Sequence, residues 1–261
     1  MSIKIGVKNK RIILMGSCGV LGKMHAKILC ENGAKLVMAD RPGSSVISDA
    51  KILGAEGVEI DVSIESSIME GVEIASKFFN GFDGAIYNAA VTSEALSNSG
   101  NPFPTFEDYP LNLWQKAIDI NLTGAFLFAR EIGKQFKLGK AGSLINISSI
   151  YGVVGPDHRI YEGQTFSSFP AYSASKAGII GLSKWLATWW AKDNIRVNCV
   201  TPGGVYNNHN DTFTNAYGNR TPMGRMASSD EITGAIIYLL SDSSKYCTGQ
   251  NIIVDGGLTT W

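Results

Sequence analysis

The chain has 261 residues, in which 23 lysines and arginines balance 23 aspartates and glutamates. This balance gives no reason to expect a nucleic-acid or anionic-membrane partner. No run of about 18 apolar residues is present, and residues 1–10 lack the apolar segment of a secretory signal, so we expect neither a membrane span nor export. The length fits one domain over residues 1–261.

The cysteines and histidines show no metal-site pattern. Cys18, Cys30, Cys199 and Cys247 are scattered, and no pair of histidines has zinc-ligand spacing. We therefore expect free thiols in a reducing cytoplasm and no bound metal.

Short apolar runs alternate with helical patterns along the chain. The first helix has Leu21, Met24, Ile28 and Leu29 on its apolar stripe, and Gly33 ends it as a C-terminal cap. Such alternation is typical of an α/β fold whose parallel sheet is covered on both faces. The expected strands are 11–15, 35–39, 57–60, 84–88, 142–147, 195–200 and 250–254, and the expected later helices are 64–79, 111–137, 172–191 and 229–241.

A glycine-rich turn joins the first strand to the first helix. In this context Gly16, Gly19 and Gly22 indicate dinucleotide binding, although a tight turn without a ligand is the alternative. The first glycine makes the turn, the second admits the pyrophosphate, and the third lets the helix pack on the strand. The helix N-terminus offers free N–H groups to the phosphates. The expected cofactor contacts are Gly16, Ser17, Cys18, Gly19, Val20, Leu21 and Gly22.

Asp40 ends the second strand, close to the position where an acid binds the adenine ribose hydroxyls. The same carboxylate would repel a 2′-phosphate, which favours NAD over NADP. Arg41 could accommodate that phosphate, so NADP is the less favoured cofactor. An ordinary turn residue before Pro42 is the alternative interpretation of Asp40.

Tyr172 and Lys176 are four residues apart, a spacing that brings side chains together only on a helix, at about 5–6 Å. An ammonium beside a phenol favours the phenolate, so we expect the pKa of Tyr172 to fall from about 10 toward working pH. That change would make the tyrosine a general acid/base. The spacing alone arises by chance in many chains.

Together with these motifs, further patterns over about residues 10–257 resemble the short-chain dehydrogenase/reductase family. The resemblance implies a Rossmann-type, doubly wound, seven-stranded parallel sheet flanked by helices. It also implies an NAD(P)-dependent oxidoreductase that interconverts an alcohol and a ketone or aldehyde. The patterns are Asp61-Val62, Asn88-Ala89-Ala90, Asn121-Leu-Thr-Gly124, Asn146-Ile-Ser-Ser149, Arg196-Val-Asn198, Pro202-Gly203, Thr248-Gly-Gln250 and Asp255-Gly-Gly257.

The resemblance implies a role for each catalytic position. Tyr172 would be the acid/base, and Lys176 would lower its pKa and hold the nicotinamide ribose. Ser149, rather than Ser148, would bond the substrate oxygen, and Asn121 would fix a water in a proton relay. A hydroxyl and a phenol reaching one carbonyl oxygen would stabilise its developing negative charge. The further cofactor contacts implied are Asp61, Val62, Asn88, Ala89, Ala90, Tyr172, Lys176, Pro202, Gly203 and Val205.

Two departures concern the cofactor side. Val20 stands where single-domain members usually have their middle glycine, and Ala90 stands where a glycine is usual. The glycine pattern resembles that of sugar-nucleotide epimerases and dehydratases, which are a rival prediction. Because only four residues follow Gly257, we expect no C-terminal substrate domain of the kind that these enzymes carry.

A third departure concerns the substrate side, because Ser149 and Tyr172 lie further apart than is usual. The catalytic set survives only if residues 158–169 form an insertion. Like residues 205–211, this segment is polar, which favours a sugar-like or anionic small molecule over an acyl chain or a steroid. The insertion weakly resembles members from bacterial flagellar and surface-glycan pathways. The expected substrate contacts are Ser149, His158, Arg159, Tyr161, Glu162 and Asn207, with Arg220 a second candidate for pairing with an anion.

Two further readings stay open. A 3-oxoacyl-type reductase is the rival enzyme, and a nucleotide-sensing protein without turnover is the rival of another class. The resemblance also implies a homotetramer or dimer. Trp185, Trp189 and Trp190 cannot all face inward on one helical stripe, which favours such a contact. A long polar loop, Thr92 to Pro110, should lie at the ligand-binding edge of the sheet.

Overall fold

The computed structural model describes residues 5–93 and 104–261, so most of the expected loop after Thr92 lies outside the described residues. Seven parallel strands form one sheet in the order β3-β2-β1-β4-β5-β6-β7, which confirms the predicted fold. The strands are β1 Arg11–Met15, β2 Lys35–Asp40, β3 Glu56–Glu59, β4 Gly84–Tyr87, β5 Gly142–Ile147, β6 Ile195–Pro202 and β7 Asn251–Val254.

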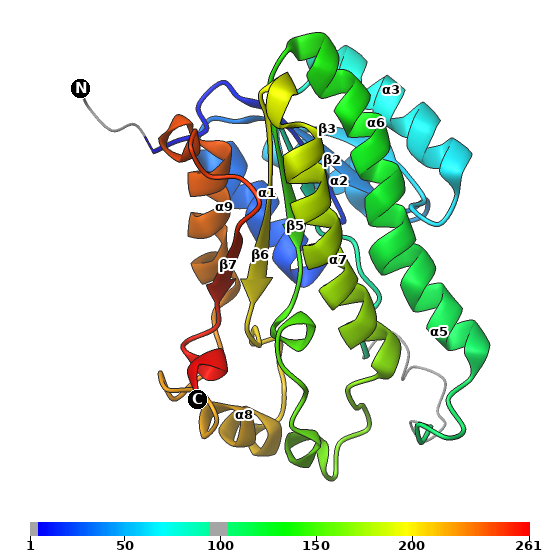
Figure 1. Cartoon of the computed structure of the whole chain (residues 1–261), viewed down its shortest axis with the longest axis vertical. Coiled ribbons are helices and arrows are strands. Elements are labelled where there is room, and N and C mark those ends of the chain that lie inside the picture. The colour runs from blue at the N-terminus through cyan, green and yellow to red at the C-terminus, as the bar shows by residue number, and fades with distance from the viewer. Residues whose placement is uncertain (1–4, 94–103) are drawn as a thin grey trace.

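Helices cover both faces of the sheet (Figure 1). Helices α3, α6 and α7 pack on one face, and α1, α2 and α9 pack on the other. The helices are α1 Val20–Glu31, α2 Val46–Leu53, α3 Glu65–Phe79, α5 Leu111–Ile118, α6 Gly124–Gly139, α7 Pro170–Trp189, α8 Asp211–Gly218 and α9 Thr233–Leu240.

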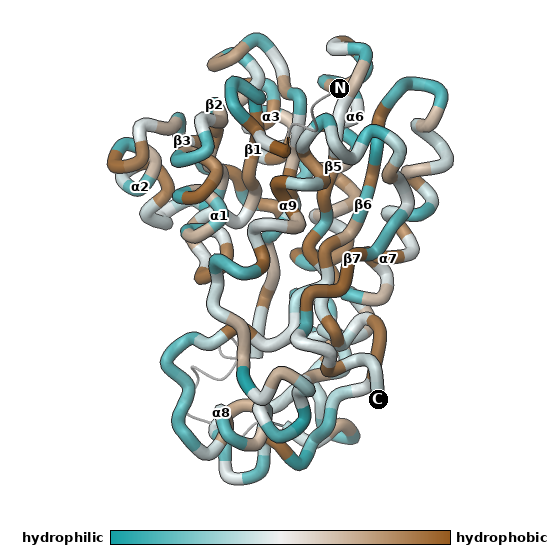
Figure 2. Tube along the Cα trace, turned by 90° about the vertical axis from the view of Figure 1, so that its left-hand side faces the viewer, coloured by the Kyte–Doolittle hydropathy of each residue, from teal (hydrophilic) through white to brown (hydrophobic). Residues whose placement is uncertain are grey.

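Alternation along the strands builds the two cores. In β1, Ile13 and Met15 pack under α3, α6 and α7, whereas Ile12 and Leu14 pack under α1, α2 and α9. Successive side chains of a strand point to opposite faces, so an apolar strand supplies both cores. Figure 2 shows hydrophobic residues along the strands and a more hydrophilic trace around α8.

The order of the strands locates the site. The chain builds outward from β1 to β3, then returns to place β4 on the other side of β1. Loops leaving β1 and β4 therefore diverge at the carboxyl edge and leave a crevice, which is where ligands bind in such sheets. The short helix α8 lies beyond the same edge (Figure 1).

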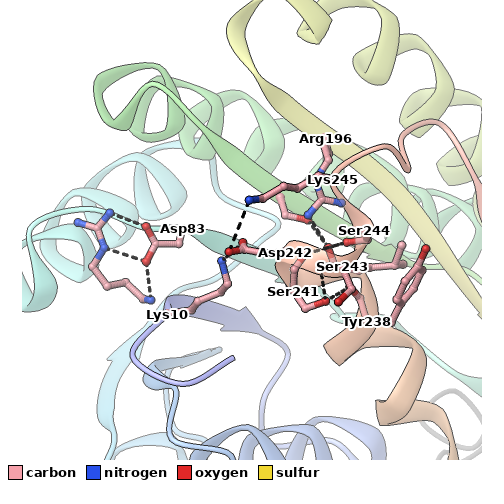
Figure 3. A network of polar contacts seen from close by, with 12 residues as sticks. Lys10, Asp83, Arg196, Tyr238, Ser241, Asp242, Ser243, Ser244 and Lys245 are labelled. Atoms are coloured by element: carbon pink, nitrogen blue, oxygen red, sulfur yellow. Dashed lines mark hydrogen bonds and ion pairs between the residues drawn. The ribbon is translucent and has the colours of Figure 1, made fainter. Parts of the chain in front are cut away.

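The amino edge is closed by ion pairs instead (Figure 3). Lys10 Nζ lies 2.9 Å from a carboxylate oxygen of Asp242, and Arg11 pairs with Asp83 at 2.6 Å. Arg196 donates to the Leu239 carbonyl at 2.7 Å. The contacts of Lys10 and Arg196 join the starts of β1 and β6 to the end of α9, and that of Arg11 joins β1 to the residue before β4, opposite the crevice.

The first helix differs from its prediction in which face is buried. Leu29 is buried as expected, but Leu21, Met24 and Ile28 are only half-buried. His25 is fully buried instead, with Nδ1 2.8 Å from the Thr233 hydroxyl on α9, and burial lowers its pKa to about 4. A neutral histidine thus packs there as a core residue.

Other differences concern helix continuity. The expected helix 111–137 is α5 and α6 joined by a π-helical turn, Asp119–Thr123. The Tyr87 hydroxyl donates to the Ile120 carbonyl at 2.5 Å, which takes that carbonyl out of the regular helical pattern. The expected helix 229–241 is a 3-10 turn followed by α9. Helices α2 and α8 were not predicted.

Candidate active site

The glycine-rich turn is held in place by its neighbours in the sheet. Gly16 has φ +81°, and a Cβ there would lie 2.4 Å from the Ala89 nitrogen. Asn88 Nδ2 donates to the Gly16 carbonyl at 2.8 Å. A Cβ on Gly22 would lie 2.1 Å from the same carbonyl. Gly16 is therefore required by the turn and Gly22 by helix packing, as the sequence predicts.

Gly19 serves a different purpose, because a Cβ there would meet nothing closer than 3.9 Å. Gly19 precedes the first turn of α1, which has no acidic residue and no capping side chain among the described residues. The free N–H groups and positive end of α1 therefore face open space, which fits a phosphate group. Val20 occupies the helix start without closing this approach.

Asp40 supports the same turn from the end of β2. Its Oδ2 accepts from the Cys18 N–H at 2.7 Å, and its Oδ1 accepts from the Arg41 N–H at 2.8 Å. A carboxylate has about four acceptor sites, so both oxygens can still accept ribose hydroxyls. The turn and Asp40 together fit the pyrophosphate and adenosine parts of a dinucleotide.

The turn opens into a cavity of about 800 Å³ at the carboxyl edge. Most of the predicted cofactor residues line it, whereas Ser17 is buried with its hydroxyl on the Ala39 carbonyl and Gly22 lies beneath the turn. The lining ones are Gly16, Cys18, Gly19, Val20, Leu21, Asp40, Arg41, Asp61, Val62, Asn88, Ala89, Ala90, Tyr172, Lys176, Pro202, Gly203 and Val205.

Helix α7 is fastened to the end of β5 below this cavity. Lys176 Nζ donates to the Ile147 carbonyl at 2.9 Å, and the Ser148 hydroxyl donates to the Lys176 carbonyl at 2.8 Å. A Cβ on Gly152 would lie 2.6 Å from the Lys176 backbone, so the turn after β5 lies directly against α7. These contacts place the predicted tyrosine–lysine helix at the cavity floor.

Tyr172, Lys176 and Ser149 all line the cavity. Lys176 Nζ lies 5.6 Å from the centre of the Tyr172 ring. Ser149 is 8% exposed, and its oxygen accepts from the Tyr151 N–H at 3.3 Å, so its proton can be donated to a ligand. Ser148 uses its proton within the fold, which supports the choice of Ser149.

Asn121 lies in the π-helical turn, fully buried and outside the cavity lining. Its Oδ1 accepts from the Val91 N–H at 2.8 Å, and its Nδ2 donates to the Ser175 hydroxyl at 3.1 Å. Ser175 in turn donates to the Tyr172 carbonyl at 2.8 Å. The amide therefore braces the exit of β4 against the start of α7, and the predicted relay through a water stays a prediction.

The expected substrate residues divide into two sets. Ser149, Tyr161 and Asn207 line the cavity. His158, Arg159 and Glu162 are exposed and lie outside its lining, contrary to their expected role. The guanidinium of Arg159 pairs with Asp157 through two bonds of 2.8 Å, which also lowers the pKa of that carboxyl.

Arg220 also pairs with Asp157, through the Oδ2 that accepts one of the two bonds from Arg159. Both arginines that were expected to bind an anionic substrate, Arg159 and Arg220, are therefore paired with Asp157. Residues 158–169, called the excursion below, form the predicted insertion between β5 and α7. Ser149 and Tyr172 therefore reach one cavity despite their separation in the sequence.

Sequence reasoning missed the aromatic part of the lining. These side chains come from the turn after β5, from the excursion and from α8, where no periodic pattern marks the inward face. Their shared signal is composition alone, since aromatic residues recur in 151–169 and in 213–217. The residues are Tyr151, Phe166, Phe169, Phe213 and Tyr217.

A Rossmann-type crevice with a serine, tyrosine and lysine at its floor defines a dinucleotide-dependent class of proteins. A family model described as "Enoyl-(Acyl carrier protein) reductase" matches residues 19–259. The chain belongs to the short-chain dehydrogenase/reductase family of oxidoreductases, as the sequence motifs indicated.

Individual relatives agree. A 3-alpha-(or 20-beta)-hydroxysteroid dehydrogenase of Mycobacterium bovis is 33% identical, over 95% of this chain and 88% of the relative. The post-translational flagellin modification protein A of Campylobacter coli is 29% identical, over 96% and 98%, in agreement with the glycan-pathway resemblance. An uncharacterized short-chain type dehydrogenase/reductase, y4vI of Sinorhizobium fredii, is 33% identical over 94% of this chain, which spans 43% of its length.

A solved structure gives the same fold. The short-chain dehydrogenase of Leptospira borgpetersenii with bound NAD⁺ superposes with a TM-score of 0.87 at 30% identity, covering 99% of this chain and 97% of that one. No helix within the described residues is long and apolar enough to cross a membrane. Nor do residues 5–93 and 104–261 bring together three or more side chains suited to a metal ion.

The buried ammonium of Lys176 should make stability depend on pH. Burial lowers its pKa from 10.5 to about 8, so between these values the unfolded chain binds more protons than the folded one. The free energy of unfolding of the native protein should therefore rise relative to that of Lys176→Met, by about 2 kcal/mol from pH 8 to pH 10. Denaturant titrations of both proteins measure this difference.

The matched control is Lys134→Met, because Lys134 is a solvent-exposed lysine on α6. Its difference from the native protein should not change over the same interval. A difference between the native protein and Lys176→Met that stays constant from pH 8 to pH 10 would contradict the burial of a charged ammonium.

Proposed function

We propose that this protein is an NAD-dependent dehydrogenase/reductase that interconverts an alcohol and a ketone, with Tyr172 as the acid/base. The observation that carries the proposal is the shared cavity, in which Ser149 and Tyr172 lie beyond a turn suited to a dinucleotide. The NAD⁺-bound structure and the relative named as a hydroxysteroid dehydrogenase support it.

The residues divide the chemistry between them. When bound, the nicotinamide supplies hydride acceptance or donation, which is the cofactor's own chemistry. In the oxidative direction, the Tyr172 phenolate takes the hydroxyl proton as the carbon loses hydride. The Ser149 hydroxyl donates a hydrogen bond to the same oxygen, and in the reverse direction Tyr172 returns the proton.

Lys176 supports this step from below. Its position is held by the Ile147 carbonyl, so the ammonium lies under the Tyr172 ring without needing a carboxylate partner. A positive charge there favours the phenolate. The ammonium would also hold the nicotinamide ribose, as the family resemblance implies.

NAD is the proposed cofactor because Asp40 places a negative charge where a 2′-phosphate would lie. Two backbone N–H groups hold the carboxylate in position. Arg41 lines the cavity beside it and is the residue that could accept NADP.

The two alternatives stand differently. The description of the matching family model favours an acyl substrate, as in the 3-oxoacyl-type reductase. A nucleotide-sensing role without turnover is disfavoured, because it would not need Ser149, Tyr172 and Lys176 in one cavity. The anionic substrate expected from the sequence is not proposed, because Arg159 and Arg220 are paired with Asp157.

Replacing Tyr172 by Phe tests the proposed chemistry. The variant lacks the proton acceptor, so NADH formation from alcohols should fall by about 10²- to 10⁴-fold. Binding of NAD, measured by calorimetry, should be retained. The exposed Tyr246 provides the control, since Tyr246→Phe should keep native rates. Undiminished turnover in Tyr172→Phe would refute the acid/base role.

Replacing Asp40 by Asn tests the cofactor preference. Asparagine can still accept the Cys18 N–H but carries no charge. The ratio of kcat/KM for NADP⁺ to that for NAD⁺ should therefore rise about tenfold, measured by steady-state kinetics. Asp242→Asn, at the opposite edge of the sheet, is the control. An unchanged ratio would show that Asp40 does not select the cofactor.

We also propose that the chain forms a homo-oligomer, a dimer or tetramer, through α7. Trp185 and Trp189 are 56% and 63% exposed and stack at 5.1 Å, whereas Trp190 is buried against α6. Large exposed aromatics mark contact surfaces. Gel filtration with light scattering should give a multiple of 28.0 kDa, reduced in Trp185→Ser/Trp189→Ser. A native monomer would exclude this interface.

A further inference from the structure

Aromatic rings form one wall at the end of the cavity beyond Ser149 and Tyr172. This aromatic wall consists of Tyr151, Tyr161, Phe166, Phe213 and Tyr217, which all line the cavity. Tyr161, Phe166 and Phe213 contact one another with ring centres 5.3–5.9 Å apart. Their tilted and edge-to-face arrangements are those in which aromatic pairs attract.

The wall is built by the turn after β5, by the excursion and by α8, and the excursion and α8 are bonded together. The Asn210 amide donates to the Gln164 side chain at 2.7 Å, which ties the excursion to the start of α8. Asp157 joins the two segments a second time through its ion pair with Arg220. The rings are therefore held in place before a ligand enters, and the wall loses little conformational freedom on binding.

No permanent charge lines this end of the cavity. Between residues 149 and 172, and again between 204 and 226, no described lining residue is Asp, Glu, Lys or Arg. The imidazole of His209 also lines it, with its ring centre 5.0 Å from that of Phe213. The charged side chains of the excursion turn outward, as Arg159 and Glu162 are exposed. A carboxylate or phosphate would find no lysine or arginine along these rings, and an unpaired charge is costly to desolvate.

The tyrosine hydroxyls of the wall do not add a charge to this end of the cavity. The hydroxyls of Tyr151 and Tyr161 lie 2.8 Å apart and bond each other, and Tyr217 accepts from the Gly204 N–H. Burial raises the pKa of Tyr151 and the pKa of Tyr217, so both phenols stay neutral. A polyol lying on the wall would lose water from several hydroxyls and meet ring carbons instead.

A second aromatic pair stands on the α7 side. Phe169 is buried, and its ring centre lies 5.5 Å from that of Tyr172. The carbon skeleton of a substrate whose reacting oxygen lies near Tyr172 would therefore be surrounded by aromatic side chains. A rigid ring system gains contact area there and has fewer rotamers to lose than an open chain.

We propose that this end of the cavity selects an uncharged alicyclic alcohol or ketone, in which the reacting carbon is a ring atom. The inference rests on the proposed function for its chemistry and on the aromatic wall for its selectivity. Phe166 and Phe213 are the specificity-determining residues.

A panel of alcohols tests the selectivity. Initial rates of NADH formation should give 2-decalol a kcat/KM at least about tenfold above that of 2-octanol and sorbitol. If the open chain or the polyol is used as well as 2-decalol, the inference fails.

Variants test the wall itself. Phe166→Leu and Phe213→Leu keep apolar bulk but lose the rings, and each should raise the KM for 2-decalol about three- to tenfold. The kcat and the KM for NAD⁺ should change less than twofold. Phe78→Leu, on α3 away from the cavity, should leave all three values unchanged. An unaltered KM for 2-decalol in both wall variants would overturn the assignment.

Binding separates this inference from the proposed function. Calorimetry of 2-decalone with the NADH complex of Tyr172→Phe needs no turnover. Binding tighter than that of 2-octanone supports the ring preference even if the native protein oxidises no alcohol, which would refute the dehydrogenase alone. Equal or weaker binding would refute the ring preference while turnover could still stand.

Discussion

The attachment of α7 to the end of β5 is the contact on which the site depends. Lys176 reaches the Ile147 carbonyl, and the Ser148 hydroxyl reaches back to the Lys176 carbonyl. Each buried polar group thus satisfies another across the helix–strand boundary, and leaving one unpaired would cost its desolvation. Because the pair of contacts fixes one turn of α7, Tyr172 has a defined place relative to Ser149.

The two edges of the sheet differ in the contacts that they make. Ion pairs such as Lys10–Asp242 close the amino edge, where the loops are short. At the carboxyl edge the chain leaves a crevice at β1 and β4, and adds the excursion and α8 beyond β5 and β6. Asn121 joins these parts by linking the exit of β4 to the start of α7. Ion pairs therefore lie at one edge of the sheet and the ligand-sized cavity at the other.

The sequence predicted those features whose residues repeat or recur at fixed spacing. The central strands contain short apolar runs, and the turn at Gly16 and the pair at Tyr172 are local patterns. The inward face of the excursion could not be predicted, because an irregular segment has no period to show which side chains are buried. Arg159 was predicted to bind an anionic substrate, but its guanidinium pairs with Asp157, only two residues away. Phe213 became a lining residue only through α8, an eight-residue helix too short to show a stripe.

The central claim is that Ser149 and Tyr172 act on one oxygen of the substrate. A crystal structure of the protein with NAD⁺ and 2-decalone tests this directly. The account predicts both hydroxyl oxygens within about 3.2 Å of the ketone oxygen, with the rings against Phe166 and Phe213. A ketone oxygen bound to other groups, with Tyr172 out of reach, would contradict it.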